Sequence, residues 1–218
     1  MQKKLWAEFL GTFCLVFAGT GAIIINEASG GAIGHAGIAM TFGLIVLAMV
    51  YTLGDVSGAH LNPAVTLGFC IARRFSLRQA LPFIGAQCSG AIVASLTLKF
   101  LFPLSRTLGA TLPSGASGQS FVLEFLLTAI LMFVILGVST GAKEKGITAG
   151  IVVGAVIGLE AMFAGPISGA SMNPARSLAP ALVSLNLGAL WIYLLAPSLG
   201  ALAGVGACRL VRQDGCCK

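Results

Sequence analysis

The sequence has very few charged residues. Of its 218 residues, only 9% are Asp, Glu, Lys or Arg, whereas 57% are hydrophobic, and the mean hydropathy is +0.97. Soluble domains carry about 25% charged residues, so the charges present here cannot cover the surface of a water-soluble protein of this length. The composition therefore excludes a sizeable soluble domain and predicts an integral membrane protein.

The sequence also lacks the alternation of polar and apolar residues that a transmembrane β-barrel requires over segments of about ten residues. It contains long, unbroken apolar runs instead. A run of roughly 20 apolar residues crosses a bilayer as a helix, so we predict an all-α membrane protein. The six predicted spans are Leu5–Ile25, Gly37–Leu53, Ala80–Phe102, Phe121–Gly141, Ile147–Ala164 and Leu187–Val211.

Basic residues gather in the loops of one side. Because cytoplasmic loops are enriched in Lys and Arg, this pattern predicts a multi-pass protein with both termini in the cytoplasm. We expect the plasma membrane, which in a bacterium is the inner membrane. The net charge of +6 then needs no nucleic-acid partner. The basic residues predicted to be cytoplasmic are Lys3, Lys4, Arg73, Arg74, Arg78, Lys143, Lys145, Arg209, Arg212 and Lys218.

Two segments of eleven residues are near copies of each other. Ser57–Leu67 reads SGAHLNPAVTL and Ser168–Leu178 reads SGASMNPARSL, with seven identical positions and a constant offset of 111. The similarity extends to EFLGTFCLVF at Glu8–Phe17 and EFLLTAILMF at Glu124–Phe133. The duplication predicts two homologous halves.

Each half contains three predicted spans. An odd number of spans makes the second half insert upside down relative to the first, as in many transporters and channels with inverted repeats. We therefore predict one membrane domain over residues 1–218, with repeats at about 1–103 and 119–212. The linker is the segment Pro103–Gln119, rich in Ser, Gly and Thr.

The two Asn-Pro-Ala motifs have the composition of helix starts, because Asn is a favoured N-cap and Pro is favoured at the first helical position. We predict two short re-entrant helices, Asn62–Ala72 and about Asn173–Val183, that meet near the middle of the membrane. Their positive dipole ends would repel cations, and each Asn amide is expected to be free to donate to a passing solute. The motif residues are Asn62, Pro63, Ala64, Asn173, Pro174 and Ala175.

With these motifs, the paired Glu-containing segments and the spacing between them, the chain resembles the aquaporin (major intrinsic protein) family over nearly its full length. The resemblance implies six transmembrane helices, two re-entrant half-helices and an inverted repeat. It also implies a homotetramer in the lipid bilayer, with one pore in each subunit. Members pass water or small uncharged solutes passively, so the resemblance implies no cofactor, no metal and no catalytic residue.

The resemblance also places four selectivity-filter residues. Arg176 matches the filter arginine and Phe42 the filter aromatic, while Ala161 falls where water-specific members carry His and Ala170 takes the fourth position. Two alanines imply a wide, apolar opening, similar to nodulin-26-like and bacterial aquaglyceroporin-type members. The implied solutes are glycerol, urea or metalloid acids such as arsenious, boric or silicic acid, together with water. A strict water channel is the alternative.

Other polar residues receive their own interpretations. Glu8 and Glu124 occupy matched positions within spans, and burial without hydrogen bonds is costly, so we expect both to brace the re-entrant loops. Glu160, next to a filter position, is either a loop brace or a pore-lining residue. His60 is expected at the inner mouth, and His35 is interpreted as a loop residue.

Three other classes of function fit the sequence less well. The sequence contains no Walker, Rossmann or catalytic-triad pattern, which argues against an enzyme. A coupled secondary transporter shares inverted repeats, but it needs titratable or ion-coordinating groups at the midplane, where this chain offers neutral Asn. A structural membrane protein would be favoured by long loops or tails, and both are short here.

Overall fold

The computed structural model describes residues 1–139 and 143–212, with the side chains of 143–147 left aside. Six helices in this part are long and apolar enough to cross a membrane, as the sequence predicted. They are α1 (Gln2–Ala28), α2 (Gly34–Ser57), α4 (Leu77–Leu101), α5 (Ser117–Val138), α6 (Lys143–Ser168) and α8 (Leu190–Val211). Three parts of the sequence predictions lie outside the described residues. They are the end of the fourth span at Gly141, the residue Lys218, and the side chains of Lys143 and Lys145.

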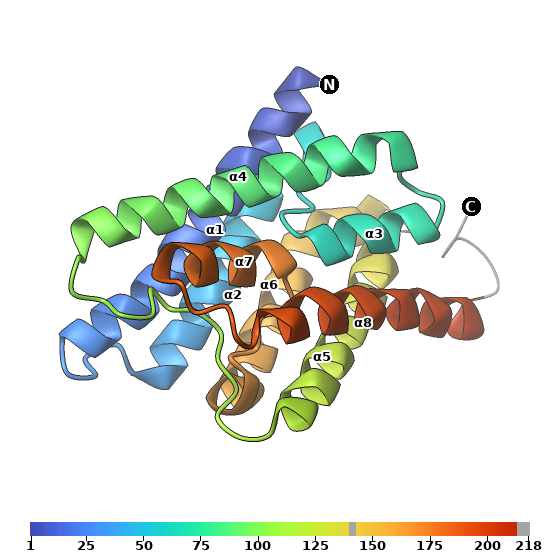
Figure 1. Cartoon of the computed structure of the whole chain (residues 1–218). Coiled ribbons are helices and arrows are strands. Elements are labelled where there is room, and N and C mark those ends of the chain that lie inside the picture. The colour runs from blue at the N-terminus through green and yellow to red at the C-terminus, as the bar shows by residue number, and fades with distance from the viewer. Residues whose placement is uncertain (140–142, 213–218) are drawn as a thin grey trace.

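Two short helices, α3 (Pro63–Ile71) and α7 (Pro174–Ser184), complete the described architecture. Their 9 and 11 residues correspond to about 14 and 17 Å at 1.5 Å per residue, which is half of a roughly 30 Å hydrocarbon core. Both pack between α4 and α8 (Figure 1). The predicted re-entrant helices are therefore confirmed, within one residue at their ends.

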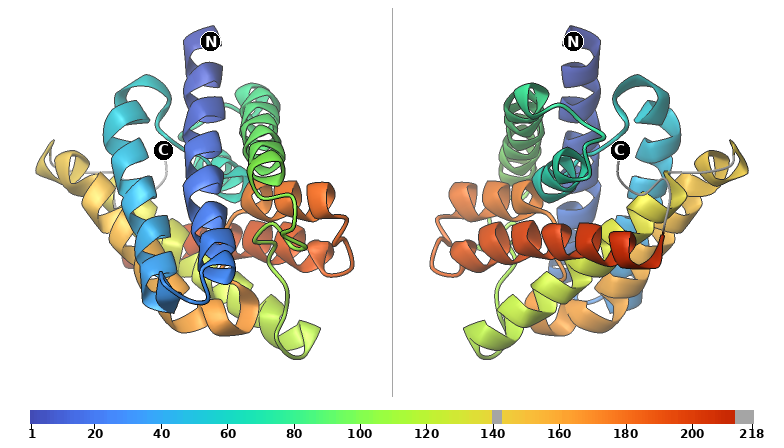
Figure 2. Two further views of the ribbon diagram at one scale, coloured as in Figure 1. Left: turned by 90° about the vertical axis from the view of Figure 1, so that its left-hand side faces the viewer. Right: turned by 90° about the vertical axis from the view of Figure 1, so that its right-hand side faces the viewer.

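The long helices are tilted relative to one another. Figure 2 shows α1 and α8 crossing at a steep angle, with the N-terminal end of α1 projecting past its neighbours. Extensive packing joins α1 to α2 and α4, and α5 to α6 and α8. The two short helices are thereby enclosed by spanning helices, which is the condition under which non-helical backbone is tolerated at membrane depth.

Glycines permit the closest helix contacts. A Cβ atom at Gly43 of α2 would lie 2.7 Å from the carbonyl oxygen of Gly154 in α6, and one at Gly154 would lie 2.6 Å from the oxygen of Gly43. Gly200 and Gly204 approach the backbone of α5 in the same way. Because lipid tails are as apolar as the side chains, van der Waals packing of this kind holds membrane helices together.

Replacement of Gly43 by Ala should destabilise the protein, because the new methyl group meets rigid backbone. Overpacking costs about 1–3 kcal/mol, so the thermal midpoint in detergent should fall. Gly85→Ala is the matched control: Gly85 is also inside a long helix, but nothing lies within 4 Å of the added Cβ. Equal midpoints for the two variants would show that the α2–α6 approach is not under steric constraint.

Candidate functional site

The two short helices begin at the Asn residues of the repeated motif. The Asn62 side-chain oxygen accepts from Ala64 N at 2.8 Å. The Asn173 oxygen accepts from Ala175 N at 3.0 Å and Arg176 N at 3.3 Å. The prolines occupy the first helical turn. The predicted caps are confirmed, so each helix directs a partial positive charge towards the site.

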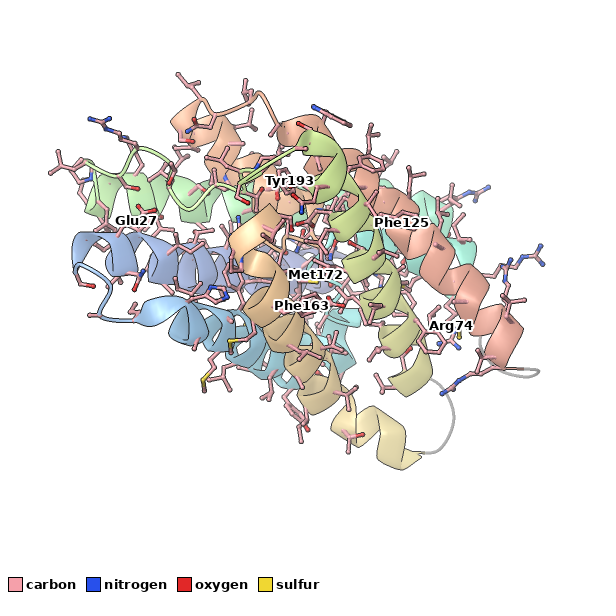
Figure 3. The ribbon with its side chains drawn as sticks, turned by 90° about the horizontal axis from the view of Figure 1, so that it is seen from below. Glu27, Arg74, Phe125, Phe163, Met172 and Tyr193 are labelled. Atoms are coloured by element: carbon pink, nitrogen blue, oxygen red, sulfur yellow. The ribbon has the colours of Figure 1, made fainter. Side chains whose placement is uncertain are left out.

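The two loops before these helices are bonded to each other. Asn62 Nδ2 donates to the carbonyl oxygen of Met172 at 2.7 Å, and Asn173 Nδ2 donates to that of Leu61 at 2.8 Å. In Figure 3, Met172 lies in the middle of the molecule, between Glu27 at one end and Arg74 at the other. We expected each Asn amide group to be free to donate to a solute. This expectation was wrong for one of the two amide hydrogens, which bonds the opposite loop instead. An amide nitrogen carries two donors, so a second one remains on each Asn.

The backbone conformation explains this reciprocal contact. Leu61 and Met172 have φ values of 51° and 53°, and Ala59 and Ala170 have 45° and 41°. These left-handed values are uncommon for residues other than glycine and recur at matched positions of the two loops. Such strain persists only where surrounding structure over-determines the backbone.

Two buried carboxylates supply the surrounding structure. Glu8 of α1 accepts from Ser57 Oγ at 2.6 Å, His60 N at 3.0 Å, Leu61 N at 2.8 Å and Gln87 Nε2 at 2.7 Å. Neither the Glu8 nor the Glu124 side chain is exposed. Each carboxylate thus bonds one loop to the spanning helices. The donors to Glu124 of α5 are Ser168 Oγ at 2.8 Å, Ser171 N at 2.9 Å and Met172 N at 2.8 Å.

A cavity runs alongside these loops. Its lining includes both cap residues, Asn62 and Asn173, together with Arg176, Phe42 and His60. Apolar side chains from four spanning helices form most of the remaining wall, among them Leu15, Val46, Leu131 and Ile157. The cavity therefore has a line of neutral and positive polar groups on one side and a hydrophobic surface on the other.

Arg176 is the only arginine or lysine that lines this cavity within the described part of the chain. Its side chain is only 2% exposed, and Nη1 donates to the Gly109 carbonyl at 2.9 Å. The guanidinium carbon lies 5.0 Å from the centre of the Phe42 ring, which is a cation–π geometry. The Phe42 ring lies directly against Gly19 of α1, where a Cβ would approach it within 2.1 Å.

The four predicted filter residues lie at the boundary of two cavities. Phe42 and Arg176 line both the cavity beside the loops, which we name the inner cavity, and a second cavity beyond them, which we name the outer cavity. Ala170 borders the inner cavity and Ala161 the outer one. The structure thus brings the aromatic ring and the arginine into contact and places one alanine on each side of them.

The remaining polar residues depart in part from expectation. His60 lines the inner cavity, with Nδ1 3.1 Å from Thr66 Oγ1 and its ring 4.7 Å from that of Phe69. Glu160 is 1% exposed, and neither of its oxygens has a partner among the described residues. It is absent from the cavity linings described above, so neither role foreseen for Glu160 is supported. Among residues 1–139 and 143–212, no group of three His, Cys, Asp or Glu is placed to hold a metal ion.

Sequence reasoning missed three residues of this site. Gly109 supplies the carbonyl for Arg176, and Gly19 gives room to Phe42; neither lies in a motif. His35 was interpreted as a loop residue, which is wrong: it is the second residue of α2 and lines the outer cavity.

Comparison with known proteins agrees with this geometry. The sequence model of the family described as Major intrinsic protein matches residues 1–207. The chain is 52% identical to Aquaporin NIP1-4 of Oryza sativa subsp. japonica, over 98% of this chain and 78% of the relative. It is 46% identical to Nodulin-26 of Glycine max, over 96% and 78%. The aquaglyceroporin structure from Plasmodium falciparum superposes with a TM-score of 0.87 at 28% identity, covering 98% of this chain and 99% of that one. Two capped half-helices, a buried arginine on an aromatic ring and these matches together show that the chain belongs to the major intrinsic protein family, the aquaporins.

Proposed function

We propose that this aquaporin is a passive channel for water and small uncharged solutes, with glycerol, urea and metalloid acids among them. The observation that carries the proposal is the meeting of two helix N-termini and Arg176 along one largely apolar cavity. Such a lining gives hydrogen bonds to neutral oxygen-bearing solutes and repels cations. The names of similar proteins, which include an aquaglyceroporin, support the wider range of solutes.

The role of each site residue follows from its contacts. Asn62 and Asn173 would use their second amide hydrogen to orient solutes at the midplane, while Pro63, Ala64, Pro174 and Ala175 start the half-helices. Glu8 and Glu124 would act as braces of the loops, outside the path of the solute. Phe42, Ala161, Ala170 and Arg176 would form the selectivity filter.

We further propose a homotetramer in the plasma membrane, with both termini in the cytoplasm. The chain would be one channel domain, with inverted repeats at about 1–103 and 119–212. Matched helix caps, matched loop conformations and matched carboxylates in the two halves support the duplication. Crosslinking in native membranes tests the assembly: bands up to four subunits are expected, and a monomer alone would overturn it.

The alternatives differ in what would cross the membrane. A strict water channel would exclude glycerol, a coupled transporter would require an ion gradient, and a structural protein would carry neither solute. Purified protein in vesicles, tested with water, glycerol, urea and arsenious acid without any ion gradient, separates these functions. Passive entry of water and at least one larger solute is expected. Absence of all passive flux from correctly folded protein would overturn the channel.

Replacement of Arg176 by Ala should weaken the rejection of cations. At an effective dielectric constant of about 20, a unit charge roughly 6 Å away raises the energy of a passing cation by about 3 kcal/mol, a factor of about 100 in rate. We therefore expect measurable cation conductance in vesicles, with solute flux retained. Arg176→Lys is the control, because it keeps the charge and should keep the rejection. If the Ala variant shows no added conductance, the dipoles of α3 and α7 are the dominant barrier.

Replacement of Ala161 by His should narrow the opening beside Phe42 and Arg176. Overpacking a close-fitting space costs about 1–3 kcal/mol, so glycerol permeability should fall by about tenfold or more while water permeability changes much less. Ala161→Ser, which adds polarity with little bulk, should retain glycerol flux. Both permeabilities are measured in the same vesicles with matched protein content. A proportional fall of water and glycerol in the His variant would contradict control of solute size at this position.

A further inference from the structure

The outer cavity is bordered by a turn of α6 that contains a proline. Pro166 lies inside this helix, and proline has no backbone N–H with which to bond the carbonyl of the residue four positions earlier. That carbonyl belongs to Met162, the neighbour of the filter residue Ala161. One backbone acceptor beside the filter is thereby left without its helical donor.

His35 of α2 replaces the missing donor. Its Nε2 lies 2.6 Å from the Met162 carbonyl oxygen. The ring packs on Gly165, where a Cβ would lie 2.8 Å from His35 Cε1. The residue at 165 must be small for this contact. Because Pro166 has no N–H, the Met162 carbonyl receives no hydrogen bond from residue 166 of its own helix.

The contact fixes the tautomer of the neutral imidazole ring. A carbonyl oxygen can only accept, so the hydrogen of the neutral ring is on Nε2, and Nδ1 is left as an acceptor. No partner of Nδ1 is recorded within residues 1–139 and 143–212, and the side chain is exposed. The backbone of α6 thus sets which nitrogen of His35 carries a lone pair.

The outer cavity is otherwise poor in polar side chains. Among the described residues that line it, only His35 and Arg176 carry a polar side chain; the rest are Ile, Ala, Phe, Leu or Gly. Arg176 can only donate hydrogen bonds. Among the described side chains that line the outer cavity, His35 Nδ1 is therefore the hydrogen-bond acceptor and Arg176 is the donor.

We propose that His35 is a specificity-determining residue of the channel, and that with Arg176 it forms an outer subsite for neutral polyhydroxylated solutes. A hydroxyl group of the solute donates to His35 Nδ1 and another accepts from Arg176. The subsite rests on the proposed permeation of such solutes. A polyol that enters an apolar space loses hydrogen bonds to water, and an unbonded buried hydroxyl is costly. The subsite replaces these lost hydrogen bonds. Water is small enough to keep water neighbours as it passes, so it depends less on His35.

The test must separate the acceptor from the contact with α6. Pro166→Ala restores an N–H for the Met162 carbonyl, so His35 is no longer needed to satisfy it. In this background, His35→Phe keeps a ring of similar size and removes both nitrogens. His35→Gln is the matched control, because its amide offers both a donor and an acceptor. Water and glycerol permeabilities are measured in vesicles of equal protein content, and thermal midpoints are measured in detergent.

In the Pro166→Ala background, His35→Phe should lower glycerol permeability by about two- to tenfold, as expected for one lost hydrogen bond. Water permeability should change by less than about twofold, and His35→Gln should retain the glycerol-to-water ratio of its parent. With Pro166 present, His35→Phe should also lower the thermal midpoint. This additional loss should vanish in the Pro166→Ala background, because the Met162 carbonyl is then bonded within α6. The thermal midpoint, which needs little protein, therefore gives a second test of the contact between His35 and the Met162 carbonyl.

Two results would overturn the inference in distinguishable ways. If the parent carries glycerol and His35→Phe leaves the glycerol-to-water ratio unchanged, the subsite is wrong and the proposed function stands. If wild-type protein carries water but no glycerol or other polyol, the proposed solute range fails and the subsite fails with it.

Discussion

Every backbone polar group in the interior of a bilayer must be bonded within the protein, and the two re-entrant loops meet this requirement through two carboxylates. Glu8 receives four hydrogen bonds and Glu124 three, several of them from loop N–H groups. With those donors satisfied, the loops can hold left-handed residues and direct the carbonyls of Leu61 and Met172 towards the opposite Asn. The caps, the helix directions and the position of Arg176 all depend on this arrangement.

Local rules explain what the sequence could predict. Asn followed by Pro and Ala is a strong helix-start signal, so the N-cap residues of α3 and α7 were predicted to the residue. The apolar runs predicted the six long helices, because a run of roughly 20 apolar residues crosses a bilayer as a helix. The contact of each Asn amide with the opposite loop could not be predicted, because it depends on the tertiary placement of two left-handed residues. His35 escaped notice for a similar reason: its partner, the Met162 carbonyl, is 127 positions away.

Arg176 places one positive charge in the wall of the inner cavity, and the described residues that line this cavity include no Asp or Glu. The Arg176 guanidinium is stabilised by the Gly109 carbonyl and by the face of Phe42. In the proposed filter, size and charge selection would be physically separate, since Ala161 and Ala170 would set the room beside Phe42 while Arg176 would set the sign of the potential.

The contact between Gly19 and Phe42 sets the position of one wall of the cavity. With no Cβ between the α1 backbone and the aromatic ring, position 19 is already at its minimum size and the ring cannot retreat from the pore. A shorter side chain at position 42 would widen the cavity here, whereas any side chain larger than hydrogen at position 19 would push the ring towards the cavity.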